Sequence, residues 1–400
     1  MDSIEPIYLT KKLIEIESTD PGKYEYKIFE YIKSLLIDNK NIELVESEVA
    51  DGRKNLMAVL KKDFDDNKNF PSLIFICHMD TVVIGDNWTK NPFGEEINGK
   101  IFGRGSADMK SGLACMLSAF SNIANDDTIQ TKPLKIIFTC DEEANMKGVE
   151  KVIEDKWVSS NDYVLDAEPT GGYIRVAHKG RIWIKLKINS KTAHASVPYE
   201  GVDANYIMSK FIVSIKNMIE SIDKDSELGF PTVTFGKISG GYQPFVVPDY
   251  CEVLCDFRVV PPIDSKYLIE SIKNIEQRIK IEQIEVYKNK GYDFSDFKVD
   301  IEILGDRPYI ERNNESEFLK MLKKSLDETL NEDTKITVFT GYTDTAVIAG
   351  KLKNINCMSY GPGSLNMAHK PDEFVDIEDI KRCEKVYMKL IKNFFNREDV

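Results

Sequence analysis

Short apolar segments that alternate with segments of helical periodicity constrain the fold of this chain more than any other feature. Residues 72–77, 134–139 and 163–167 are apolar almost throughout, not at every second position. Strands of this kind are buried on both faces, as happens when helices cover both sides of a largely parallel sheet. Residues 111–124 have the spacing and small-residue face of one such helix. We therefore predict an α/β fold with a mostly parallel sheet and helices on both faces.

The pattern changes near residue 180, where apolar residues begin to alternate with polar ones. Ile182, Ile184 and Leu186 are separated by polar or amphipathic residues, which indicates a sheet covered on one face only. The expected order from there is strand, helix, strand, strand, helix and strand, over residues 181–189, 201–222, 232–238, 250–259, 264–280 and 298–304. This βαββαβ order predicts a small ferredoxin-like domain.

The chain returns to α/β character after about residue 305, so the second domain is an insertion. A helix is expected over 314–330, strands over 335–340 and 354–360, and a long helix from 377. A length of 400 residues also exceeds what one hydrophobic core usually serves. We predict a discontinuous first domain, 1–179 and 306–400, with the second domain at 180–305.

The charge and the cysteines restrict the partners and the compartment. Lys and Arg number 53 against 66 Asp and Glu, a formal charge of −13, which disfavours nucleic acid and anionic membranes as partners. No segment approaches the roughly 20 apolar residues of a membrane span, and the N-terminus lacks an apolar signal core. The seven cysteines form no CxxC pair, as is usual for reduced thiols. We expect a cytoplasmic protein with neither nucleic-acid nor membrane partners.

Potential metal ligands follow several of the predicted strands. The chain has only four histidines, so two of them beside acidic residues stand out. The candidate side chains are His78, Asp80, Glu142, Glu143, Glu168 and His369, with Asp108 in the loop before the helix at 111. Because the carboxyl ends of parallel strands form one crevice, we expect these side chains to meet there. Two imidazoles and three carboxylates can hold two divalent ions, and this ligand mixture suits zinc, with cobalt or manganese also possible.

Each of these signals has an ordinary structural explanation as well. His78 could be a hydrogen-bonded histidine, Asp108 could cap the following helix, and adjacent acids such as Glu142 and Glu143 often form a solvated face. Asp80 favours the metal interpretation, because residues i and i+2 of an extended segment face the same side. Its carboxylate could then orient the imidazole of His78.

Five segments resemble those of the zinc-dependent aminoacylases, acetylornithine deacetylases, succinyl-diaminopimelate desuccinylases and related carboxypeptidases and dipeptidases. They are CHMDTV, NWTKNPFGEEINGKIFGRGSADMKSG, TCDEEANMKG, DAEPT and GPGSLNMAHKPDEFV, and the resemblance covers nearly the whole chain. It implies that His78 and Glu168 hold one ion. It further implies that Glu143 and His369 hold the other ion, with Asp108 bridging the two.

The resemblance also implies the catalytic residues. Glu142 corresponds to the general base, and Asp80 to the catalytic support of the first histidine. KTAHASVPYEGVDA is similar to a motif whose histidine, here His194, reaches the active site of a partner subunit and stabilises the oxyanion. The resemblance thus makes 180–305 a lid and dimerisation domain, and the first domain the di-metal catalytic domain of a homodimer.

Substrate contacts are implied by two further segments. DYCEVLCDFRVVPP resembles a strand whose arginine, here Arg258, binds a substrate carboxylate, although an ion pair with Asp256 is an alternative. FTGYTDTAV resembles a substrate-side loop with Thr343 and Asp344. The sequence departs from the family at Phe245, where the family commonly has Asn.

The resemblance implies a di-metal amidohydrolase that removes an acyl group from an N-acyl amino acid with a free carboxylate. The alternative is a dipeptidase or carboxypeptidase of the same family, and a remote alternative is a non-catalytic binding protein on the same scaffold. Other enzyme classes lack support, because the sequence has neither a GxSxG nor an HExxH motif. Asp108 also occupies the third glycine position of a dinucleotide-binding loop.

Overall fold

The computed structural model describes residues 4–61, 70–126 and 132–397 and divides into two compact units. The first unit comprises Met1–Ala177, Glu311–Phe339 and Thr343–Val400. The second comprises His178–Ile310 and Thr340–Tyr342. Among the described residues, no helix is both long enough and apolar enough to span a bilayer.

The first unit is built around a sheet for which eight strands are described. Their order across the sheet is β1-β2-β6-β3-β7-β16-β8-β15. The strands are β1 (Ile42–Ala50), β2 (Arg53–Leu60), β3 (Leu73–His78), β6 (Leu134–Thr139), β7 (Tyr163–Asp166), β8 (Ile174–His178), β15 (Ile336–Phe339) and β16 (Cys357–Ser359).

The sheet is mixed, which corrects the prediction of a mostly parallel one. The four central strands β6, β3, β7 and β16 are parallel to their neighbours within that group. The pairs β1–β2, β2–β6 and β16–β8 are antiparallel. The tight turn at Asp51-Gly52, with Gly52 at φ +71°, folds β1 back onto β2. The apolar runs at 73–78, 134–139 and 163–166 thus mark the parallel centre but not the antiparallel edges.

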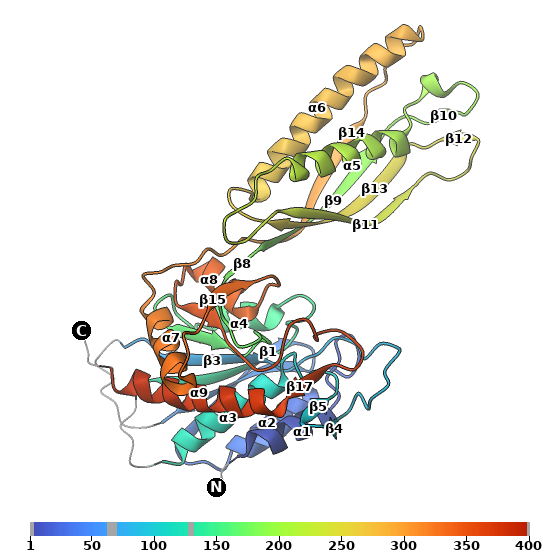
Figure 1. Cartoon of the computed structure of the whole chain (residues 1–400). Coiled ribbons are helices and arrows are strands. Elements are labelled where there is room, and N and C mark those ends of the chain that lie inside the picture. The colour runs from blue at the N-terminus through green and yellow to red at the C-terminus, as the bar shows by residue number, and fades with distance from the viewer. Residues whose placement is uncertain (1–3, 62–69, 127–131, 398–400) are drawn as a thin grey trace. The chain divides into compact units, whose positions relative to one another are not determined.

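Helices cover the two sides of this sheet, with α3 and α9 on one side and α4 and α8 on the other (Figure 1). In α3 every residue except Asn122 is buried, because the helix lies among α1, α9 and β3. The helices are α1 (Pro6–Glu15), α2 (Tyr26–Leu36), α3 (Lys110–Ala124), α4 (Lys147–Glu154), α7 (Glu317–Leu330), α8 (Asp344–Leu352) and α9 (Ile377–Phe395). A smaller sheet of order β17-β5-β4 joins β4 (Glu95–Ile97), β5 (Lys100–Phe102) and β17 (Phe374–Asp376).

The second unit has an antiparallel sheet of order β11-β13-β9-β14 with α5 and α6 packed on it (Figure 1). Its main elements are β9 (Gly180–Asn189), α5 (Ala204–Glu220), β11 (Thr232–Gly240), β13 (Tyr250–Val259), α6 (Ser265–Asn289) and β14 (Lys298–Arg307). Short elements β10 (Ala193–His194), η1 (Pro198–Glu200) and β12 (Val246–Val247) complete it. Alternate residues of β9 and β13 are buried and form a core with Phe211 of α5 and Ile272 of α6. The role of this unit as a lid stays a prediction.

Candidate metal centre

His78 is the last residue of β3, at the carboxyl edge of the parallel strands, and its side chain is buried. Its Nε2 atom lies 3.2 Å from Oδ1 of Asp108 and 3.6 Å from Oε1 of Glu168. Its Nδ1 atom lies 2.9 Å from the backbone carbonyl oxygen of Asp80 but 3.8 Å from the Asp80 carboxylate. With the proton on Nδ1, the ring donates to that carbonyl and turns Nε2 towards the carboxylates.

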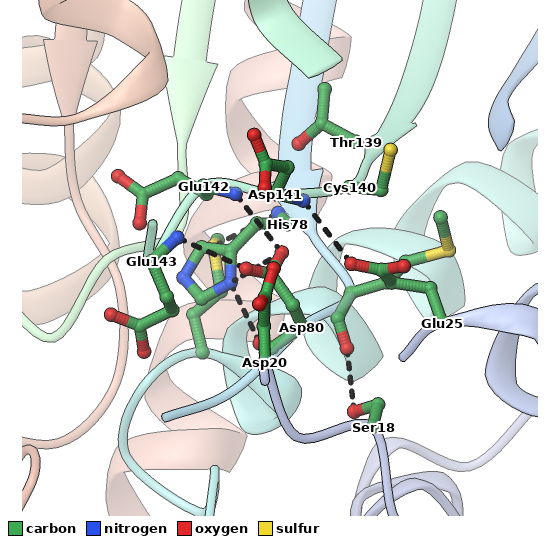
Figure 2. A network of polar contacts seen from close by, with 12 residues as sticks. Ser18, Asp20, Glu25, His78, Asp80, Thr139, Cys140, Asp141, Glu142 and Glu143 are labelled. Carbon is green, nitrogen blue, oxygen red and sulfur yellow. Dashed lines mark hydrogen bonds and ion pairs between the residues drawn. The ribbon is translucent and has the colours of Figure 1, made fainter. Parts of the chain in front are cut away.

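The Asp80 carboxylate holds the acidic loop that follows β6 (Figure 2). Its Oδ1 accepts the backbone N–H of Glu142 at 3.2 Å, and its Oδ2 accepts that of Glu143 at 3.0 Å. Asp80 is fully buried, and burial raises the pKa of its carboxyl group to about 7. Sequence spacing suggested that this carboxylate would orient His78, but in the structure the carbonyl contacts the ring and the carboxylate contacts the loop.

Asp108 lies between the two predicted metal-binding histidines. Its Oδ1 faces His78, and its Oδ2 lies 3.4 Å from Nε2 of His369. His369 Nε2 is also 3.0 Å from Oε2 of Glu143, and these two carboxylates, Asp108 first, raise the pKa of His369 to about 10. Burial raises the pKa of Asp108, but the two imidazoles outweigh burial and hold it below its usual range. Carboxylates that raise the pKa of a neighbouring imidazole in this way also favour a bound cation.

The donor atoms fit divalent cations. Donors of His78, Asp108 and Glu143 lie within 4.8 Å of one another, as do donors of His78, Glu142 and Glu168. Among the described residues, Oε1 of Glu143 is a buried oxygen with no hydrogen-bond partner. Buried carboxylates that outnumber the imidazoles need further positive charge, and a metal ion supplies it. Imidazole nitrogen with carboxylate oxygen is a donor set that zinc and similar ions accept.

Glu142 is buried beside the ligand cluster, where burial raises the pKa of its carboxyl group well above the usual value. Burial raises the pKa of Glu168 in the same way, and the nearby Asp108 adds to this effect. The five predicted ligands and Glu142 therefore come together in the first unit.

Arg104 and Glu373 are site-forming residues that sequence reasoning missed. Oε1 of Glu373 accepts the backbone N–H groups of Ala107 and Asp108 at 2.9 and 3.0 Å, and Oε2 accepts from Gly105 at 3.2 Å. Arg104 Nη1 donates to Glu373 Oε2 at 2.6 Å and to the carbonyl of Lys370, next to His369, at 3.3 Å. The pair thus joins the loops that carry Asp108 and His369. Arg104 and Glu373 lie in two of the segments that resemble the family, but nothing in their sequence spacing predicts this contact.

Thr343 and Asp344 lie inside the fold at the start of α8. Thr343 is the N-cap residue, and its hydroxyl accepts from the backbone N–H of Ala346 at 3.4 Å. Asp344 Oδ2 accepts from the Thr139 hydroxyl at 2.6 Å. Both side chains are buried, at 1% and 4% exposure, and they stabilise α8 and the end of β6. Their contact with substrate stays a prediction.

His194, Arg258 and Phe245 belong to the second unit. His194 is exposed on β10, and its Nδ1 lies 2.8 Å from the Ser196 hydroxyl. Arg258 makes the alternative ion pair, with Nη2 3.1 Å from Oδ2 of Asp256. Phe245 has an exposed side chain. The predicted roles of His194 and Arg258 in substrate chemistry stay predictions.

Sequence relatives cover nearly the whole chain. An uncharacterised metallohydrolase of Methanocaldococcus jannaschii is 31% identical over 98% of this chain and all of the relative. A probable succinyl-diaminopimelate desuccinylase of Staphylococcus epidermidis is 26% identical over 98% of each.

Solved structures share the fold. The aminopeptidase PepT of Bacillus cereus matches with a TM-score of 0.74 and 22% identity, over 98% of this chain and 99% of that one. The YXEP protein of Bacillus subtilis, described as a dinuclear metal binding peptidase from the M20 family, matches with a TM-score of 0.67 and 15% identity, over 98% and 97%.

The family model for peptidase family M20/M25/M40 matches residues 74–393. That range includes every predicted metal ligand and reaches into all three segments of the first unit. The chain therefore belongs to peptidase family M20/M25/M40 and is a metallohydrolase acting on amide or peptide C–N bonds.

Proposed function

We propose that this chain is a di-metal amidohydrolase that removes the acyl group from an N-acyl amino acid. The observation that carries the proposal is the position of Asp108, whose two oxygens face His78 and His369 separately. A carboxylate in that position suits a bridge between two ions. The relative described as a probable succinyl-diaminopimelate desuccinylase supports the deacylase reaction.

The ligands divide into two sets around Asp108. His78 and Glu168 would hold one ion, on the side where His78 Nε2 faces both carboxylates. Glu143 and His369 would hold the other ion, and Oε2 of Glu143 lies 3.0 Å from Nε2 of His369 in the structure. Zinc is the proposed metal, with cobalt or manganese as substitutes. Bound ions of this kind polarise a carbonyl group and lower the pKa of water.

Glu142 is the proposed general base. Its carboxylate would take a proton from the attacking water and pass it to the departing nitrogen. Burial raises the pKa of this carboxyl group, and a raised pKa suits a residue that accepts a proton. Asp80 supports this step by holding the backbone N–H groups of Glu142 and its neighbour.

The second unit would bind the rest of the substrate. Arg258 would fix the free carboxylate of a small substrate, exchanging its present partner Asp256 for it. His194 of the partner subunit would donate to the oxyanion in a homodimer. Closure of the second unit as a lid would exclude water from the reaction. Phe245, in place of the family's usual Asn, would present an apolar contact to the substrate.

A metallopeptidase acting on dipeptides or C-terminal residues is the second candidate. The fold shared with an aminopeptidase and a dinuclear peptidase favours it. The two candidates differ in the group on the carbonyl side of the scissile bond, so substrate preference distinguishes them.

Hydrolysis of N-acetyl amino acids, N-succinyl amino acids and dipeptides tests the proposal. The protein is assayed as purified, after chelation, and after addition of Zn²⁺, Co²⁺ or Mn²⁺. Glu142→Ala is compared with Glu154→Ala, a change on α4 where the side chain is 70% exposed. We expect metal-dependent turnover that only Glu142→Ala abolishes. Preference for acylated amino acids supports the deacylase, and preference for dipeptides the peptidase. A protein that binds no divalent ion contradicts both.

A further inference from the structure

Two buried carboxylates hold three successive backbone N–H groups of the acidic loop (Figure 2). Glu25 Oε1 accepts from Asp141 at 3.2 Å, and the Asp80 carboxylate accepts from Glu142 and Glu143. Glu25 is 1% exposed and lies at the N-cap of α2, far from the loop in sequence. The backbone of the proposed base, of one proposed ligand and of the residue before them is therefore held by side chains from two separate segments of the chain.

Asp141 has a backbone conformation that needs support. Its φ is +65°, in the left-handed region that costs a non-glycine residue about 1 kcal/mol or more. Its carboxylate accepts from Lys147 N at 3.1 Å, and its carbonyl accepts from Met146 N at 2.6 Å. This conformation turns the chain at the end of β6, so that Glu142 and Glu143 follow on the side of His78.

Arg53, the first residue of β2, binds both Glu25 and Asp141. Its Nη1 donates to Asp141 Oδ1 at 3.0 Å, and its Nε donates to Glu25 Oε2 at 2.9 Å. Nη2 contacts Glu25 Oε1 and lies 2.7 Å from Asp20 Oδ2. The guanidinium is largely buried, with 14% of the side chain exposed, and three carboxylates surround it.

The charge balance makes Arg53 hard to replace. Oxygens of Asp20, Glu25 and Asp80 lie within 4.8 Å of one another. Without the guanidinium, the carboxylates of Asp20, Glu25 and Asp141 that it pairs with would repel one another in a buried site, which is costly. The repulsion would be relieved by movement of Asp141, and the loop with Glu142 and Glu143 would move with it.

We propose that Arg53, paired with Glu25, is a positioning residue that holds the acidic loop in place beside the metal centre. This inference rests on the proposed roles of Glu142 as base and Glu143 as ligand. Displacement of a reacting group by about 1 Å can cost on the order of 100-fold in rate. Arg53 is therefore expected to affect kcat and ion affinity while touching neither substrate nor metal.

Three single variants and one double variant test the inference. Arg53→Met removes the charge but keeps an unbranched apolar stem, and Arg53→Lys keeps the charge but loses the fork of donors. Arg397→Met is the matched control, because Arg397 is also partly buried and pairs with Glu317 at 3.1 Å, away from the acidic loop. Each holoenzyme is assayed well below its melting temperature. The readouts are kcat, KM, ion affinity by chelator competition, and hydrogen exchange at residues 141–143.

In Arg53→Met we expect kcat to fall about 10- to 100-fold with little change in KM, weaker binding of one ion, and faster exchange at 141–143. Arg53→Lys should recover part of each loss. Adding Asp141→Asn to Arg53→Met should also recover kcat, because Asn tolerates the left-handed region and carries no buried charge. Arg397→Met should lower the melting temperature without changing kcat, ion affinity or exchange at 141–143.

Two outcomes separate this inference from the proposed function. If the wild type hydrolyses amides with bound ions but Arg53→Met keeps its kcat, ion affinity and exchange rates, Arg53 is not a positioning residue and the function stands. If the wild type binds no ion and hydrolyses nothing, the proposed function is wrong. The exchange at 141–143 still shows in that case whether Arg53 orders the loop.

Discussion

Glu373 illustrates how one side chain can place a metal ligand without being one. It accepts three backbone N–H groups from residues 105–108 and a fourth hydrogen bond from Arg104. Glu373 thus fixes the backbone of Asp108, so that the Asp108 side chain can present one oxygen to each imidazole. Substitution of outer partners of this kind typically costs about 10- to 100-fold in metal affinity or activity.

Glu373→Gln should weaken both ion binding and the fold. The amide NH₂ group cannot accept from Arg104 and Gly105, so buried donors lose their partner at a cost of about 1–3 kcal/mol. Ion affinity should fall about 10- to 100-fold. Chelator competition and thermal unfolding measure the two effects. Glu378→Gln, which removes only an exposed contact with Lys381, should change neither, and equal behaviour of the two variants would contradict this role.

His178 should make stability sensitive to acid. Burial lowers its pKa to about 4, from about 6.5 in the unfolded chain, so the unfolded state binds more protons between these values. The contribution of His178 to the free energy of unfolding is therefore fully present above pH 6.5 and is lost as the pH falls towards 4. By pH 5 the loss is about 2 kcal/mol. Urea unfolding at pH 7 and pH 5 measures this. In His178→Gln the loss between the two pH values should be smaller by that amount, and an unchanged pH dependence would refute the assignment.

At the scale of elements, the close approach of α3 to the end of β7 brings the Asp108 loop near Glu168. Gly112 permits this approach, because a Cβ atom there would lie 2.3 Å from the carbonyl oxygen of Ala167, next to Glu168. Alanine usually stabilises a helix relative to glycine, but here the added methyl group meets backbone atoms, whose displacement is costly.

Gly112→Ala should destabilise the fold by about 1–3 kcal/mol, the usual cost of overpacking a core. It should also displace Glu168 and weaken ion binding. Gly236→Ala is the control, since the nearest atom to its Cβ would be 4.0 Å away. Thermal unfolding and ion titration compare the two. A Gly112→Ala protein as stable as the wild type would mean that α3 shifts freely.

The sequence predicted the elements with strong local signals. The central strands were recognisable because they are apolar throughout, and the ligands because each follows such a strand or lies in the adjacent loop. Strand β1 was missed because its charged residues alternate with apolar ones in an irregular way. Glu25, Arg53 and Glu373 were missed for a different reason. Their partners are distant in sequence, and an isolated acidic or basic residue carries no local signal of a buried contact.

At the scale of the whole molecule, the second unit presents β11 as an edge strand of its sheet. Ile238 on this strand is 58% exposed. An open edge with an exposed apolar residue can pair with another chain. This feature agrees with the dimer that the family resemblance predicts.

Light scattering should give a mass twice the 45.6 kDa of one chain for the wild type. Ile238→Lys should give a single-chain mass, because a charge at the edge opposes pairing. Ile281→Lys, on α6 and 68% exposed, should remain dimeric. Retention of the dimer by Ile238→Lys would place the interface elsewhere, and a monomeric wild type would rule out the predicted homodimer.

Strand β16 lies between β7 and β8 in the sheet, although it follows both in the chain by well over 100 residues. During translation the ribosome therefore completes the second unit before it has made β16, the strand that joins β7 to β8 in the sheet of the first unit. The second unit can fold as an independent body while β7 still waits for its neighbour. A nascent chain halted before Cys357 would carry an unpaired edge on β7 and lack His369. Synthesis thus delays completion of the metal centre until His369 has emerged, and the aggregation-prone edge of β7 stays exposed until β16 pairs with it.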